Sequence, residues 1–185
     1  MTETNQQRRK WLALGGIVLG SALMPTELLA AVSTPKPRIL SFRNINNGER
    51  LTSQLVNGKI TSAAVLQQLN YFMRDRRSQQ VTRMDPKLFF KLYHIQSQLG
   101  LRNTEIQIVC GYRAPATNAA MRRRSRGVAK NSYHTRGQAI DFRIDAVSLA
   151  QVRKAAMGLN NGGVGYYPRS NFVHIDTGPV RTWRG

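Results

Sequence analysis

One segment, SYHTRGQAID at residues 132–141, decides how the rest of the chain is interpreted. His134 ends a polar stretch, Gly137 provides a turn, and the residues that lead to Asp141 are typical of a strand. A second segment, NFVHID at residues 171–176, places His174 on another expected strand. If the two strands are neighbours in a sheet, the three side chains can meet at one point.

Two neutral imidazoles and one carboxylate are a common ligand set for zinc, and they leave the fourth tetrahedral position open for water. Such an ion lowers the pKa of water to about 7 and can polarise a peptide carbonyl. Composition alone leaves another interpretation open, in which Asp141 pairs with an arginine and both histidines are satisfied in loops. The remaining histidine, His94, lies on an expected helix with no acid or second histidine at ligand spacing.

The surrounding sequence predicts an α+β domain with a small antiparallel sheet flanked by helices. Strands are expected at 39–42, 50–55, 105–110, 138–144, 163–167 and 171–177, and helices at 62–74, 86–99 and 148–159, with a short helix after Pro115. The helix at 86–99 has the clearest signals, because Asp85 can cap it, Pro86 suits its first turn and Gly100 suits its end.

Residues 1–31 have the organisation of an export signal. Arg8, Arg9 and Lys10 precede an apolar run at 11–24, and the twin arginines are similar to a twin-arginine signal. An uncleaved anchor is the alternative, but the run has 14 residues and a spanning helix needs about 20. We therefore expect a linker at 32–38, a working domain at 39–185, and a location in the periplasm or cell envelope.

The chain is strongly basic, with 28 lysines and arginines against 9 acids and a net charge of +19. Such a charge attracts polyanions, including nucleic acid, anionic lipid and acidic wall polymers. The export signal and the lack of a nucleic-acid motif argue against nucleic acid. We expect anionic envelope polymers as partners, with membrane contact only through the export signal.

The single cysteine, Cys110, excludes an internal disulfide framework and a zinc site built from cysteines. It continues the alternation of Ile106 and Ile108, so it is interpreted as a small core residue rather than a nucleophile.

The pattern Ser-x-His-x-x-Gly-x-Ala-x-Asp at 132–141 resembles the zinc-ligand signature of the D-Ala-D-Ala peptidase/lysostaphin/hedgehog-type peptidases. Gly111-Tyr112-Arg113 is similar to a segment of the D-Ala-D-Ala peptidase branch, and residues 162–168 and 172–178 resemble the murein endopeptidase K subgroup. The resemblance is dense from 108 to 183 and thinner back to residue 39.

This resemblance implies a zinc-dependent murein endopeptidase that hydrolyses peptide cross-links of peptidoglycan, with its peptidase domain at 39–185. It implies that His134, Asp141 and His174 bind Zn²⁺. It also implies that Arg113 binds the substrate or the developing oxyanion, for which its fork of donors is suited. The expected partners are peptidoglycan stem peptides and cross-links, with a meso-diaminopimelate residue beside the cut.

The general base is the point at which the chain departs from the family pattern. Related enzymes have an acid three residues before the last metal histidine or a histidine two before it, whereas this chain has Asn171 and Phe172. Asp176, on the same strand face as His174, is expected either to act as the base or to orient His174. The missing base keeps an alternative open, a non-catalytic metal-containing module that binds or scaffolds the cell wall.

Overall fold

The computed structural model describes residues 38–56, 59–60, 62–101, 103–125 and 127–185. The expected export signal, and all of the expected linker except Arg38, lie outside these residues. Among the helices that are described, none has both the length and the apolar character required to cross a membrane.

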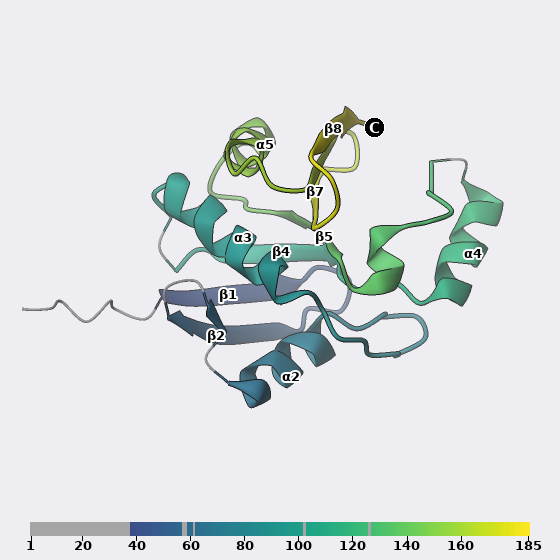
Figure 1. Cartoon of the computed structure of the whole chain (residues 1–185), viewed down its shortest axis with the longest axis horizontal. Coiled ribbons are helices and arrows are strands. Elements are labelled where there is room, and N and C mark those ends of the chain that lie inside the picture. Colours follow the sequence, from purple (N-terminus) through teal and green to yellow (C-terminus); the bar gives the residue numbers. More distant parts are fainter. Residues whose placement is uncertain (1–37, 57–58, 61, 102, 126) are drawn as a thin grey trace, which may run out of the picture. The chain divides into compact units, whose positions relative to one another are not determined.

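The described residues form one eight-stranded sheet with helices around it (Figure 1). The strands are β1 (Arg38–Asn44), β2 (Arg50–Val56), β3 (Lys59–Ile60), β4 (Glu105–Cys110), β5 (Ala139–Arg143), β6 (Gly163–Tyr167), β7 (Phe172–Asp176) and β8 (Arg181–Arg184). The helices are α2 (Ala63–Phe72), α3 (Pro86–Gln98), α4 (Pro115–Arg124) and α5 (Leu149–Gly158), with a 3-10 helix, η1 (Tyr133–Arg136). The strand order is β3-β2-β1-β4-β5-β7-β6-β8.

The α+β class is confirmed, but the sheet is larger than predicted and it is mixed. Two pairs, β1 with β4 and β6 with β8, are parallel, and the other pairs are antiparallel. The parallel pairing of β1 and β4 requires a long crossover, which the chain makes through β2, β3, α2 and α3. The two edge strands that were not predicted, β3 and β8, span only 2 and 4 residues and show little periodicity.

The helix with the clearest sequence signals forms as predicted. Asp85 accepts a hydrogen bond from the Lys87 amide at 3.0 Å, and Pro86 occupies the first turn of α3. The apolar stripe of this helix, which includes Leu88 and Leu92, is fully buried. Helix α3 is therefore anchored at its start and packed along one side.

The core lies between the sheet and helices α2, α3 and α5. Phe42 on β1 packs against Phe72 of α2 and Phe89 of α3, with ring centroids 5.9 and 6.4 Å apart. Each large apolar side chain buried here contributes about 1.5–3 kcal/mol to folding. In Figure 1, α4 stands beyond the strand ends, apart from these three helices. The central strands β4, β5 and β7 contribute buried residues to this core. The same strands carry Cys110, Asp141 and His174.

Candidate metal centre

Strand register brings two of the predicted ligands together. Asp141 on β5 lies directly opposite His174 on β7, and Cys110 on β4 pairs with Asp141 from the other side. His134 comes from η1, immediately before β5. Gly137 ends η1 with a φ of 67°, and a Cβ there would lie 2.5 Å from the Arg83 carbonyl oxygen, so the turn requires glycine.

Three donor atoms of these side chains form a small triangle. His174 Nδ1 lies 2.8 Å from Asp141 Oδ1, and His134 Nε2 lies 3.2 Å from both of these atoms. Tetrahedral zinc, with bonds of about 2.0–2.2 Å, separates its nitrogen and oxygen ligands by roughly 3.3 Å. The three side chains are buried, at 3%, 5% and 8% exposure for His134, Asp141 and His174. The donor set and its spacing therefore fit one face of a zinc coordination sphere.

The outer nitrogen of each histidine is held by an acceptor. His134 Nδ1 lies 2.7 Å from the Gly111 carbonyl oxygen, which can only accept, so this nitrogen carries the proton. His174 Nε2 lies 3.1 Å from Asp176 Oδ2, to which it donates. Both rings are thereby oriented with a lone pair toward the triangle, as is usual for histidines that bind metal.

Asp176 is the most constrained acid of the centre, with no exposed surface. Besides His174 it accepts from Arg181 at 2.6 and 3.1 Å and from the amides of Gly163 and Gly178 at 2.9 Å each. Burial raises the pKa of Asp176, but these hydrogen bonds outweigh burial and hold the pKa well below its usual range. A Cβ on Gly163 would come within 2.5 Å of this carboxylate, so glycine makes the contact possible.

A buried lysine supports the same strand end from the core. Lys91 of α3 is 2% exposed, and its ammonium group donates to the backbone carbonyls of Asn161 and Asp176. Burial lowers the pKa of Lys91, and the nearby Asp176 carboxylate partly offsets that effect. Helix α3 is thus connected through Asp176 to His174.

Without a metal ion the centre holds an ion pair. Burial lowers the pKa of His134, but the Asp141 carboxylate and the Cys110 sulfur outweigh it and raise the pKa to about 10. The pKa of Asp141 is held below its usual range because His134 and His174 outweigh the effect of burial. A cation that takes these ligands therefore displaces a proton from His134.

Cys110 does not lie in the core, where its alternation with Ile106 and Ile108 predicts it. Its sulfur, a His134 ring nitrogen and an Asp141 oxygen all lie within 4.8 Å of one another, so the thiol lies at the centre rather than in the core. Burial raises the pKa of Cys110, yet His134 outweighs it and the net pKa is lowered. The alternation of residues along β4 predicts a core position for Cys110. A bulge shifts the register between Ile108 and Cys110, so this prediction is wrong.

Arg113 lies beside the centre, as predicted from its motif. Its guanidinium donates to Asn118 Oδ1 at 3.3 Å and to the Cys110 sulfur at 3.5 Å, and its amide donates to the His134 carbonyl at 3.1 Å. Among the described residues, no carboxylate forms an ion pair with it. The charge of Arg113 is therefore available to a ligand.

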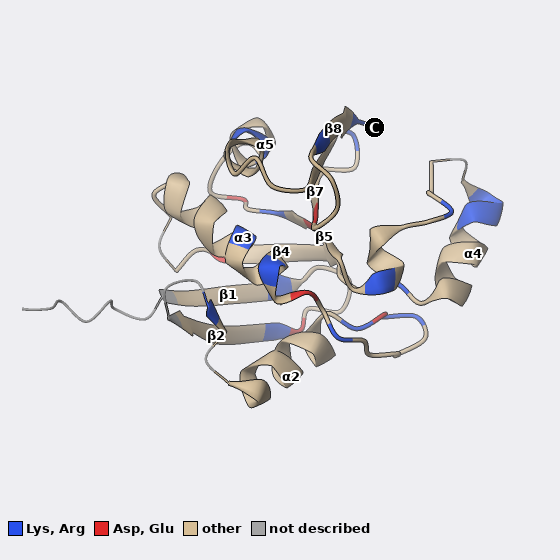
Figure 2. Ribbon diagram, viewed as in Figure 1, with Lys and Arg blue, Asp and Glu red and all other residues tan. Residues whose placement is uncertain are grey.

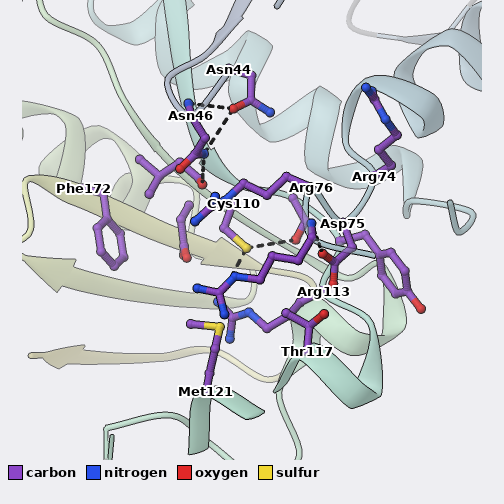
Figure 3. A pocket seen from close by; sticks show the side chains of 15 residues that line it. Asn44, Asn46, Arg74, Asp75, Arg76, Cys110, Arg113, Thr117, Met121 and Phe172 are labelled. Atoms are coloured by element: carbon purple, nitrogen blue, oxygen red, sulfur yellow. Dashed lines mark hydrogen bonds between the residues drawn. The ribbon is translucent and has the colours of Figure 1, made fainter. Parts of the chain in front are cut away.

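Two open cavities meet at Arg113 and Asp141. The first, of about 240 Å³, is shown in Figure 3 and extends toward the loop after α2. The second, of about 370 Å³, is lined by both histidines and by Tyr133, Tyr167 and Trp183. Phe172 lies on the wall of both cavities. Together they form a cleft beside the donor triangle.

A half-open His-His-Asp centre in a cleft of an α+β domain is an arrangement typical of metallopeptidases. The model of one peptidase family, described as peptidoglycan L,D-endopeptidase MepK, matches residues 32–183. The chain belongs to this family, and the resemblance to the murein endopeptidase K subgroup is confirmed. It is therefore an enzyme of the peptidase class.

Two relatives match over nearly their whole length. A Haemophilus influenzae protein described as "Probable peptidoglycan L,D-endopeptidase MepK" is 61% identical over 185 residues, covering 100% of both chains. The Escherichia coli K12 protein "Peptidoglycan L,D-endopeptidase MepK" is 50% identical over 183 residues, covering 99% of this chain and 100% of its own. No solved structure matches this chain significantly.

Proposed function

We propose that this protein is a zinc-dependent L,D-endopeptidase that hydrolyses peptide cross-links of peptidoglycan, with His134, Asp141 and His174 as the zinc ligands. The observation that carries the proposal is the triangle of donor atoms 2.8–3.2 Å apart, placed beside an open cleft. The family match supports the substrate, since the relatives are described as peptidoglycan L,D-endopeptidases. The fixed outer nitrogens of both histidines support a permanent metal site.

A zinc ion held by His134, Asp141 and His174 would supply a Lewis acid suited to activating water at neutral pH and polarising the scissile carbonyl. The protein provides the rest. Arg113 presents an uncompensated guanidinium beside the ligands, where it can stabilise the negative charge that develops on the carbonyl oxygen. Phe172 and the tyrosines of the second cavity form apolar walls that hold the peptide and limit access of water.

Asp176 is best assigned as a positioning residue. Its carboxylate faces the outer nitrogen of His174, whereas Nδ1 on the other side of that ring faces the donor triangle. All of its contacts are with hydrogen-bond donors of the protein, and none of its surface is exposed. Such a group orients the ligand and raises its basicity. A role as general base, the other expectation, would require it to reach water in the cleft.

Replacing Asp176 with asparagine is expected to weaken zinc binding by about 10–100-fold, the usual effect of losing a partner of a metal ligand. Competition with a chromophoric chelator measures the affinity, and the pH profile of kcat at saturating zinc measures the chemistry. Asp145→Asn is the matched control, because Asp145 is exposed and remote from the ligands. Unchanged zinc affinity together with loss of the acidic limb of the kcat profile would instead identify Asp176 as the base.

The proposed function is tested with purified cross-linked muropeptide dimers. The protein with one equivalent of zinc is expected to convert dimers to monomers, chelation is expected to stop the reaction, and added zinc is expected to restore it. Comparing dimers joined through two diaminopimelate residues with D-alanine-linked dimers identifies the bond that is cut. Binding to intact sacculi with no cleavage under zinc-replete conditions would favour the non-catalytic wall-binding module over the peptidase.

The proposed substrate lies outside the cytoplasm, which supports a location in the periplasm or cell envelope. We propose that residues 1–31 direct export by the twin-arginine route, that 32–38 are a linker, and that 39–185 are the peptidase domain. The chain's net charge of +19, with lysines and arginines marked blue along the ribbon in Figure 2, suits attraction to anionic envelope polymers.

A further inference from the structure

The first cavity has a positively charged wall, of which the proposed chemistry uses only Arg113. It is lined by four arginines, Arg74, Arg76, Arg77 and Arg113, of which the first three follow α2 directly. Figure 3 shows Arg76, Arg113 and Cys110 around this space. We call it the arginine pocket. Because Asp141 and Arg113 also belong to the second cavity, the arginine pocket adjoins the candidate metal centre.

Most of this positive charge has no carboxylate partner among the described residues. Arg74 is ion-paired with Glu49 at 3.1 Å and lies over the ring of Tyr71, so it is occupied. Arg76 and Arg77 are exposed, and no described carboxylate lies within ion-pair distance of either of them. Arg76, Arg77 and Arg113 therefore line the pocket without an ion pair to any described carboxylate.

The acid within this loop is occupied by other contacts. Asp75 is 3% exposed and accepts hydrogen bonds from the amides of Arg77, Ser78 and Ala114 at 2.8, 3.2 and 2.7 Å. Burial raises its pKa, but these contacts and one with Thr117 outweigh burial and lower the pKa. Asp75 thus remains charged, and its role is to shape the loop. The other acid on the wall, Asp141, is already bound to the two histidines.

The loop is fastened to the segment that carries Arg113. The Tyr112 amide donates to the Met73 carbonyl at 2.7 Å, and the Ala114 amide donates to Asp75, so both neighbours of Arg113 are attached to the loop. The loop backbone at Arg76 and Arg77 is therefore held at a fixed place relative to Arg113. Such preorganisation reduces the entropy cost of binding a ligand.

We propose that the arginine pocket binds a free carboxylate of the cross-link beside the bond that is cut, with Arg76 and Arg77 as the residues that select it. This inference rests on the proposed function and specifies the substrate as a peptide whose diaminopimelate carboxylate is not amidated. Guanidinium groups match carboxylates in geometry and charge. A volume of about 240 Å³ suits one short acidic arm rather than a glycan chain.

The test measures binding rather than turnover. Full-length protein is titrated calorimetrically with a synthetic tripeptide that ends in diaminopimelate, and with the same peptide after amidation of its diaminopimelate carboxylates. The double variant Arg76→Ala/Arg77→Ala is expected to bind the free acid roughly tenfold more weakly than wild type, because it loses two partly screened charge-assisted contacts. Wild type is expected to prefer the free acid over the amide by a similar factor, and the double variant is expected to lose this preference.

The matched control is Arg122→Ala/Arg123→Ala, which removes two adjacent exposed arginines from α4 that line neither cavity. This control is expected to bind both peptides like wild type. Equal affinity of wild type for the acid and the amide, absence of binding, or an equal loss in the control variant would overturn the inference.

The dimer cleavage assay separates this inference from the proposed function. A protein that binds the free acid selectively but never cleaves dimers would keep the arginine pocket and refute the peptidase. A protein that cleaves dimers but binds the acid and the amide equally would support the peptidase and refute the inference about the arginine pocket.

Discussion

Replacing His134 with alanine is expected to lower the rate of cross-link hydrolysis by at least about a thousandfold, which corresponds to the several kcal/mol that a metal contributes as a Lewis acid. His134 supplies one of the three donor atoms, and it is also the group that Asp141 and Cys110 hold in place. Its loss leaves two ligands, which is too few for a catalytic zinc site. The rate is measured on cross-linked dimers, and bound zinc is measured by metal analysis after dialysis.

His94→Ala is the matched control for this substitution, because the ring of His94 packs against Phe90 on α3 rather than at the metal centre. It is expected to retain one equivalent of zinc and most of the activity. A His134→Ala protein that is folded, retains stoichiometric zinc and cleaves dimers at the rate of wild type would exclude His134 as a ligand.

Replacing Arg113 with alanine is expected to lower kcat by about 100–1000-fold, the usual effect of removing a donor to a developing oxyanion. Its guanidinium has no acidic partner among the described residues, so the substitution leaves no buried carboxylate unpaired. Arg113→Lys is expected to recover only part of the activity, since lysine keeps the charge but not the planar fork. Both constants, kcat and KM, are measured on a soluble dimer with zinc at saturation.

Which of these two constants changes decides the role of Arg113. A rise in KM with unchanged kcat would show that Arg113 holds the substrate in the ground state instead of stabilising the transition state. Arg123→Ala, a single change on the exposed face of α4, controls for the loss of one positive charge.

The local signals in the sequence were reliable, but they did not predict the parallel strand pairs. Helix α3 was predicted to within one residue because a cap, a proline and a terminal glycine all lie at its own ends. The parallel pairing of β1 with β4 depends on residues more than 60 positions apart, for example Ser41 with Glu105, and no local pattern reports it. Strand β8 is stabilised mainly by pairing with β6, so its own four residues show only a weak alternation.

The proposed ligands could be chosen from sequence because their motif fixes two of them within eight residues of one another, 134 to 141. The surroundings of these residues could not be chosen in the same way. The thiol of Cys110 reaches the centre through a bulge, and Arg76 and Arg77 reach the cleft because Asp75 and Met73 attach their loop to the segment around Arg113. These residues become neighbours of the site only through tertiary contacts, which the local sequence at the end of the predicted helix 62–74 does not indicate.

Lys91 of α3, which donates to the Asp176 carbonyl, limits the substitutions that this enzyme can accept at position 91. A hydrophobic residue at position 91 would suit the packing around it, yet it would leave two carbonyl groups in the interior without a donor. The same residue also fixes the strand end that carries His174, one of the three proposed ligands. Folding and catalysis therefore share one side chain, and a sequence that drifts toward a more apolar interior at this position loses the alignment of its reactive centre.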